Sequence, residues 1–146
     1  MNNFSIRTAR RSDRTPIRKL IWKVRINVFG LNWRNFLVAT DGGGRLIGCG
    51  QLKPHGRRTI ELASIAVDER VRGQGIARAL IETLLTRAPR PLYLICLPGM
   101  TGLYERFGFS RAPGEGLPRH FRIVARVSVF ARHFHRSHAP VIMRLD

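Results

Sequence analysis

The sequence is poor in cysteine and lacks long apolar runs, and both shortages exclude classes of protein. The only cysteines among 146 residues are Cys49 and Cys96, and neither has the spacing of a metal site or a redox pair. We expect both to be buried thiols inside strands, in a reducing compartment. No apolar run approaches the roughly 18–20 residues that span a bilayer. The first residues, Met1-Asn2-Asn3, lead directly into a strand pattern rather than a signal peptide. We therefore expect a soluble, cytoplasmic protein without a transmembrane segment.

Acidic residues and lysines are also scarce, so arginine dominates the charge. Nine acidic residues stand against 26 basic ones, which gives a formal net charge of +17, and the only lysines are Lys19, Lys23 and Lys53. Such a surface can attract a phosphorylated ligand, an acidic substrate, an anionic membrane or nucleic acid. Because the arginines are spread from Arg7 to Arg144, a compositional bias explains them equally well, and both interpretations stay open.

The pattern of apolar residues and turn residues indicates one mixed α/β domain. The length suits a single domain over residues 1–146, and Asp41-Gly42-Gly43-Gly44 predicts a hairpin turn. Ser12 or Asp13 is placed to cap a helix that follows the first strand. The expected strands cover residues 4–9, 35–40, 46–53, 59–67, 92–97, a segment that begins at 109, and 141–145, and two further helices cover 75–87 and 100–107.

The segment 67–77 is typical of a loop that binds phosphate. It places Gly73 and Gly75 between the strand 59–67 and the helix 75–87, where residues without a Cβ let an oxygen-rich group approach the unpaired N–H groups of the helix. Arg70 and Arg72 add cationic side chains to this positive helix end. A dinucleotide fingerprint would need a third glycine where Arg78 stands, and no lysine is present for a P-loop.

Two motifs in this order resemble the GNAT superfamily of acyl-CoA-dependent N-acyltransferases. The first is Arg70-Val71-Arg72-Gly73-Gln74-Gly75, preceded by the strand 61–67. The second, Leu103-Tyr104-Glu105-Arg106-Phe107-Gly108-Phe109, is similar to the family's Tyr-x-x-x-Gly-Phe segment. The resemblance covers nearly the whole chain. It departs from the family's pattern at Leu97, where the family often has an asparagine that contacts the coenzyme.

The resemblance implies a fold, a cosubstrate and a binding site. The implied fold is α/β, with a mixed, mostly antiparallel sheet that is splayed at the acyl-CoA site and flanked by helices. Acetyl-CoA is the implied cosubstrate, and its pantetheine arm would pair with the backbone of residues 65–67, opposite the strand 92–97. Its phosphates would lie on the loop that we call the cradle, residues 70–77. The expected binding residues are Ile65, Ala66, Val67, Arg70, Val71, Arg72, Gly73, Gln74, Gly75, Ile76 and Ala77.

The resemblance also implies two catalytic residues, each with a plainer alternative. Tyr104 matches the general acid that protonates the leaving thiolate, and it could instead be an aromatic residue that packs at a helix end. Glu61 resembles the carboxylate that accepts the proton of the amine, and it could instead be a solvated residue or pair with Arg57 or Arg58.

The connection at about 113–140 is longer than the one this family often has, and its middle predicts an amphipathic helix. That helix could be a lid, a membrane-surface helix, a docking face for an acidic macromolecule, or a helix packed on the sheet. His133, His135 and His138 suggest a metal site, but no carboxylate lies near them in the sequence. We expect no metal.

The function that the resemblance implies is transfer of an acetyl group from acetyl-CoA directly to a primary amine. The acceptor would be a small amine such as an arylalkylamine, or a protein lysine or N-terminus. The alternative is a basic nucleic-acid- or ribosome-associated binding module on the same fold. Besides acetyl-CoA and the amine, an acidic macromolecule on the arginine-rich surface and a second copy of the chain, in a homodimer, are candidate partners.

Overall fold

The structure, a computed structural model, describes residues 3–132 and 139–146. The chain divides into two compact units, and each is described by itself. The first comprises residues 1–53 and 62–88, and the second comprises residues 54–61 and 89–146. Among the described residues, no helix is long and apolar enough to cross a membrane.

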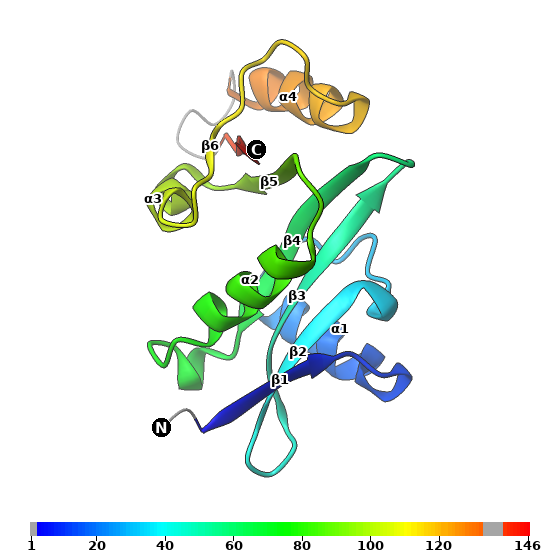
Figure 1. Ribbon diagram of the computed structural model, residues 1–146, viewed down its shortest axis with the longest axis vertical. Helices are drawn as coiled ribbons and strands as arrows, with labels where there is room; N and C mark the ends of the chain where they lie inside the picture. The colour runs from blue at the N-terminus through cyan, green and yellow to red at the C-terminus, as the bar shows by residue number, and fades with distance from the viewer. Residues whose placement is uncertain (1–2, 133–138) are drawn as a thin grey trace. The chain divides into compact units, whose positions relative to one another are not determined.

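The first unit is built on four strands in the order β1-β2-β3-β4 (Figure 1). β1 pairs with β2 and β2 with β3 in antiparallel registers. The elements are β1 (Phe4–Thr8), the 3-10 turn η1 (Arg11–Asp13), α1 (Arg14–Lys23), the 3-10 turn η2 (Trp33–Asn35), β2 (Phe36–Asp41), β3 (Leu46–His55), β4 (Thr59–Val67), the 3-10 turn η3 (Glu69–Val71) and α2 (Ile76–Arg87).

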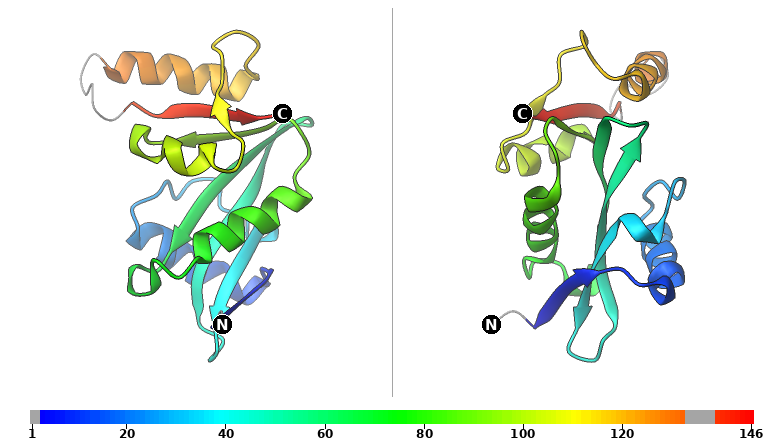
Figure 2. Two further views of the ribbon diagram at one scale, coloured as in Figure 1. Left: turned by 60° about the vertical axis from the view of Figure 1, so that its left-hand side comes forward. Right: turned by 45° about the vertical axis from the view of Figure 1, so that its right-hand side comes forward.

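The two long helices of this unit cover opposite faces of its strands (Figure 2). α1 buries Ile17, Leu20 and Ile21, which recur at the three- and four-residue steps of a helix face. They form a core with residues of the strands that include Val38 and Cys49. Alternate residues of β3 face this core and face α2, because successive side chains of a strand point to opposite sides of the sheet.

Glycines in β3 let α2 lie close to the strands. A Cβ on Gly48 would stand 2.9 Å from Ile76 Cγ2 and 3.2 Å from Leu80 Cδ1. A Cβ on Gly50 would stand 2.5 Å from Ile65 Cδ1 and 3.0 Å from Leu84 Cδ1. The absence of these two side chains fixes the distance between α2 and β3, and thereby the position of the loop that leads into α2.

In the described part of the second unit, β5, β7 and β6 pair in that order, so the last strand of the chain lies between two earlier ones. Both pairings are antiparallel, and Leu92 is opposite Leu145 in the β5–β7 register. Its helices α3 and α4 lie on opposite sides of these strands in both views of Figure 2. The elements are β5 (Leu92–Cys96), the 3-10 turn η4 (Pro98–Met100), α3 (Thr101–Glu105), β6 (Ser110–Arg111), α4 (Arg119–Arg132) and β7 (Val141–Leu145).

An aromatic core joins α4 to these strands. Phe121 is fully buried on α4 and stacks on Tyr93 of β5, with 4.8 Å between ring centroids. Leu117 completes the buried cluster, and Ile95 and Ile142 pack against it. The basic helix expected within 113–140 therefore packs on strands of its own unit through its first two turns.

The expected elements are confirmed, with two local differences. The expected helix 100–107 is shorter, because η4 precedes α3 and the chain turns after Glu105. Asp13 does stand at the N-cap of α1, but its side chain makes no cap hydrogen bond. It accepts from the Arg10 backbone at 2.7 Å and from the Arg7 guanidinium at 2.6 and 3.1 Å.

Candidate functional site

The cradle between β4 and α2 has the backbone that its glycines predict. Gly73 has φ +81° and Gly75 has φ +83°, and Gly75 is the N-cap of α2. Side chains rarely adopt this left-handed conformation, so both positions favour glycine. Both residues are exposed. The first N–H groups of α2 have no partner within the helix, and they follow a loop that leaves room for a ligand to approach.

A buried carboxylate holds the start of the cradle. Asp68 is 6% exposed, and its side chain accepts the backbone N–H of Arg70 at 3.0 Å. It also accepts two bonds from the Arg70 guanidinium, at 2.8 and 3.2 Å. These bonds, first from the Arg70 side chain and then from its backbone, hold the pKa of Asp68 well below its usual range. Asp68 is not among the expected binding residues, although an aspartate that bonds the backbone two residues on is a common turn signal.

The cradle side chains lie in different environments. Arg70 pairs with Asp68, while Arg72 and Gln74 are exposed. Ile76 is buried in the core, so only its backbone can face a ligand. Val71 and Ala77 are half-buried.

β4 contains a backbone outlier directly before the segment 65–67. Ser64 has φ +58° in the middle of the strand, a conformation that costs a non-glycine residue about 1–3 kcal/mol and is concentrated at functional sites. Gln51 Nε2 donates to Ser64 Oγ at 2.8 Å, and Cys49 Sγ donates to the Ser64 carbonyl at 3.7 Å. No local pattern in the sequence predicts this feature. Burial raises the pKa of Cys49 to about 12, so this thiol stays protonated and is a poor nucleophile.

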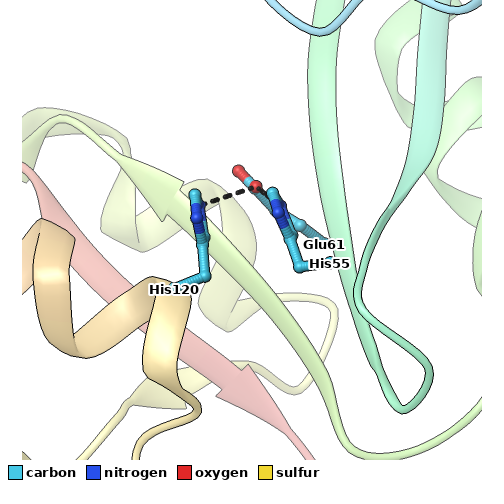
Figure 3. A group of neighbouring side chains, drawn as sticks. All are labelled: His55, Glu61 and His120. Carbon is cyan, nitrogen blue, oxygen red and sulfur yellow. Dashed lines mark hydrogen bonds and ion pairs between the residues drawn. The ribbon is translucent and has the colours of Figure 1, made fainter.

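Glu61 is buried between two histidines (Figure 3). It is 7% exposed, and its Oε1 lies 2.7 Å from His55 Nε2 and 3.8 Å from His120 Nε2. Within the described residues, the side chains that come within ion-pair distance of Glu61 are these histidines rather than Arg57 or Arg58. The interpretation of Glu61 as a solvated or arginine-paired residue is therefore wrong.

Tyr104 lies on α3, and its ring meets Phe109 edge-on at 6.1 Å between centroids. The chain reverses directly after it, because Gly108 has φ +95° and Phe109 N–H donates back to the Tyr104 carbonyl at 3.2 Å. Burial, followed by the nearby Cys96, raises the pKa of Tyr104 to about 12. The hydroxyl therefore stays protonated at any pH at which catalysis would be measured.

The other positions singled out in the sequence are Leu97 and three histidines near the C-terminus. Leu97, which stands in place of the family's asparagine, is 56% exposed directly before η4. His133, His135 and His138 lie outside the described residues.

A comparison with family models matches residues 32–111 to the family described as "Acetyltransferase (GNAT) domain". Among curated proteins, the uncharacterized N-acetyltransferase YhbS of Escherichia coli K12 is 38% identical over 87 residues. That match covers 56% of this chain and 52% of YhbS, so the chain spans about half the length of the curated relatives it matches.

Solved structures of low sequence identity share the fold. Rv2747 from Mycobacterium tuberculosis, solved in complex with CoA and NLQ, has a TM-score of 0.72 at 22% identity, over 97% of this chain and 98% of that one. N-acetylglutamate synthase from Neisseria gonorrhoeae, complexed with coenzyme A and N-acetyl-glutamate, has a TM-score of 0.71 at 21% identity. That match covers 98% of this chain and 35% of the synthase.

Proposed function

Because the chain belongs to the GNAT acetyltransferase family, we propose that it transfers an acetyl group from acetyl-CoA directly to a primary amine. The observation that carries this proposal is the left-handed pair Gly73 and Gly75 at the exposed N-terminus of α2. The complexes of Rv2747 and of N-acetylglutamate synthase with coenzyme A support the choice of cosubstrate.

In the proposed complex, the pyrophosphate of acetyl-CoA accepts hydrogen bonds from backbone N–H groups of the cradle, residues 70–77. Asp68 fixes the loop, so little conformational entropy is lost when the anion binds. Arg72 adds a cationic side chain, whereas the charge of Arg70 is already balanced by Asp68. The strained Ser64 supports a role for the neighbouring backbone of Ile65, Ala66 and Val67 in binding the pantetheine arm.

The proposed reaction forms one C–N bond and breaks one C–S bond. The neutral amine attacks the thioester carbonyl, and the intermediate then expels the thiolate of coenzyme A. Glu61 accepts the proton that the amine nitrogen loses, and the Tyr104 hydroxyl supplies the proton that the thiolate gains. A phenol whose pKa is about 12 is a weak acid toward a thiolate near 8.5, so its contribution depends on a close hydrogen bond rather than on driving force.

The acceptor must be neutral when it attacks. An alkylamine of pKa about 10.4 is neutral in about one molecule in a few thousand at pH 7, which costs roughly 4–5 kcal/mol. An α-amino group near 7.7–8.0 costs only about 1 kcal/mol. A carboxylate that accepts a proton therefore matters most for an alkylamine acceptor, such as a small amine or a protein lysine, and less for an N-terminus.

The net charge of +17 keeps a second function open, that of a basic nucleic-acid-binding module. Titration of the protein with acetyl-CoA, beside the same titration with a single-stranded polynucleotide at several salt concentrations, separates the two. The enzyme proposal requires acetyl-CoA binding together with release of free coenzyme A when an amine is added. Polynucleotide binding without any binding of acetyl-CoA would contradict the enzyme proposal and support the nucleic-acid-binding module.

A further inference from the structure

The side chains of His55, Glu61 and His120 form a compact cluster, which we call the His-Glu-His cluster (Figure 3). Each residue offers one ligand atom, and these atoms lie within 4.8 Å of one another. All three residues belong to the second compact unit. His55 ends β3, Glu61 lies near the start of β4, and His120 lies in the first turn of α4.

The cluster has an aromatic wall formed by Phe121 and Tyr93. Phe121 is fully buried and meets both histidine rings edge-on, at 5.9 Å from His55 and 5.1 Å from His120 between centroids. Tyr93, which is 4% exposed, stacks on Phe121. A low-polarity surrounding strengthens interactions between a cation and its ligands.

From this arrangement we infer that His55, Glu61 and His120 bind a divalent transition-metal ion, with Zn²⁺ the ion that the donors suit best. Two imidazoles and one carboxylate are a common three-residue set for zinc, with a fourth position left for water or substrate. Imidazole ligands also disfavour Mg²⁺ and Ca²⁺, which prefer oxygen.

The spacing fits such an ion after a small adjustment. Bonds of about 2.0–2.2 Å in a tetrahedral site place ligand atoms about 3.4 Å apart. The two separations from Glu61 Oε1, 2.7 and 3.8 Å, lie on either side of that value. The rings now stack with an interplanar angle of 13°, so at least one ring must rotate for an ion to lie in the planes of both. His120, whose side chain is 37% exposed, is the ring with room to rotate.

The charge of the protein works against a cation only at long range. Screening at physiological salt reduces interactions between exposed charges beyond about 8 Å, whereas coordination bonds act within the cluster itself. Net charge therefore slows the arrival of the ion more than it weakens the bound state.

An ion in this cluster would have a consequence for catalysis, and this consequence rests on the proposed function. The carboxylate that accepts the amine proton would be occupied as a ligand. Zn²⁺ would then inhibit acetyl transfer, and a chelator would restore it.

The test is a competition titration of the full chain against a chromophoric zinc chelator, in the absence of acetyl-CoA. We expect one ion per chain, and a loss of affinity of at least about 10–100-fold in His55→Ala and in His120→Ala. Substitution of Co²⁺ should give the visible absorption of a tetrahedral site in the wild type and not in His120→Ala. Because His120 is half-exposed, this variant should fold, which circular dichroism checks.

The control is a triple variant with alanine at His133, His135 and His138, which carry the chain's other imidazoles. It should bind zinc as the wild type does. The inference is overturned if the wild type takes no stoichiometric ion, or if the triple variant loses the ion while His120→Ala keeps it. Tight zinc binding that leaves turnover unchanged supports the metal site and contradicts the role of Glu61 as proton acceptor.

Discussion

The Asp68 carboxylate binds Arg70 through both its backbone and its side chain, at 3.0 Å to the backbone nitrogen and at 2.8 and 3.2 Å to the guanidinium. One buried acid thus fixes both the path of the loop and the direction of its first arginine. The glycines that follow depend on this anchor, because a phosphate cradle binds well only when its N–H groups are held in place before the ligand arrives.

The first prediction concerns Gly75→Ala. A Cβ at Gly75 would meet no protein atom within 4 Å, but it would occupy the space through which a pyrophosphate approaches the backbone. Losing one or more charge-assisted hydrogen bonds of about 1.5–3 kcal/mol should weaken acetyl-CoA binding at least about tenfold. Isothermal titration measures the change.

The matched control for this prediction is Gly44→Ala, in the β2–β3 hairpin. Gly44 has φ +81° and also has open space around its Cβ position. Both variants should lose similar stability, of about 1–2 kcal/mol, from the left-handed backbone. Equal acetyl-CoA affinities in the two variants would contradict the cradle assignment.

The second prediction concerns Tyr104→Phe. This change keeps the ring that meets Phe109 and removes the hydroxyl. Loss of the proton donor should lower kcat by about 10²–10⁴ while acetyl-CoA affinity stays the same. In the wild type, the raised pKa of about 12 means that no loss of activity from ionised Tyr104 is expected below about pH 11. Near-normal turnover in the variant would leave Tyr104 as a packing residue.

The third prediction concerns the acceptor and the role of Glu61. Activity on primary alkylamines should rise from pH 6 to 9, because the neutral fraction of the amine increases about tenfold for each unit. Glu61→Gln should lower turnover and make this rise steeper, while the exposed control Glu115→Gln leaves both unchanged.

The assay for this prediction measures release of free coenzyme A over a panel of arylalkylamines, polyamines, amino acids and peptides. If no amine reacts at any pH although acetyl-CoA binds, the proposal of an enzyme is wrong and that of a binding module is favoured.

The fourth prediction concerns stability in acid. The pKa values of Asp68 and Asp13 are lowered, chiefly by side-chain bonds from Arg70 and Arg7 respectively. A lowered pKa in the folded state stabilises the protein above the unfolded value of about 3.9, and this stability is lost as the pH falls through the folded pKa. Asp68→Asn and Asp13→Asn should therefore lower the unfolding midpoint at pH 7, and the gap to the wild type should narrow as the pH falls from about 4 to 2. Part of the Asp68→Asn gap should remain at pH 2, because the pKa of Asp68 is held well below its usual range.

Thermal unfolding at pH 7, 4, 3 and 2 checks this prediction. Asp146→Asn is the control, because its carboxylate is 77% exposed and exposed pairs contribute little to stability. A gap between wild type and Asp68→Asn that stays constant down to pH 2 would show that packing, not ionisation, stabilises the loop.

The sequence by itself determined the features that depend on local patterns. The strands 59–67 and 141–145 have the bounds that their apolar residues predict, and the glycines of the cradle take the left-handed conformation. Local patterns were less reliable where a long-range partner competes. Asp13 was expected to cap α1, but Arg7 and the Arg10 backbone bind its carboxylate instead.

Only the tertiary structure decided which side chains surround Glu61. His55 lies six residues before Glu61, and His120 lies 59 residues after it. No periodicity links the three positions, and the histidines that suggest a metal site in the sequence are His133, His135 and His138, for which we expect no metal. The cluster forms because the β3–β4 turn and the start of α4 belong to one compact unit, in which Phe121 packs against Tyr93. Packing of this kind depends on contacts between distant residues, so a local pattern cannot specify it.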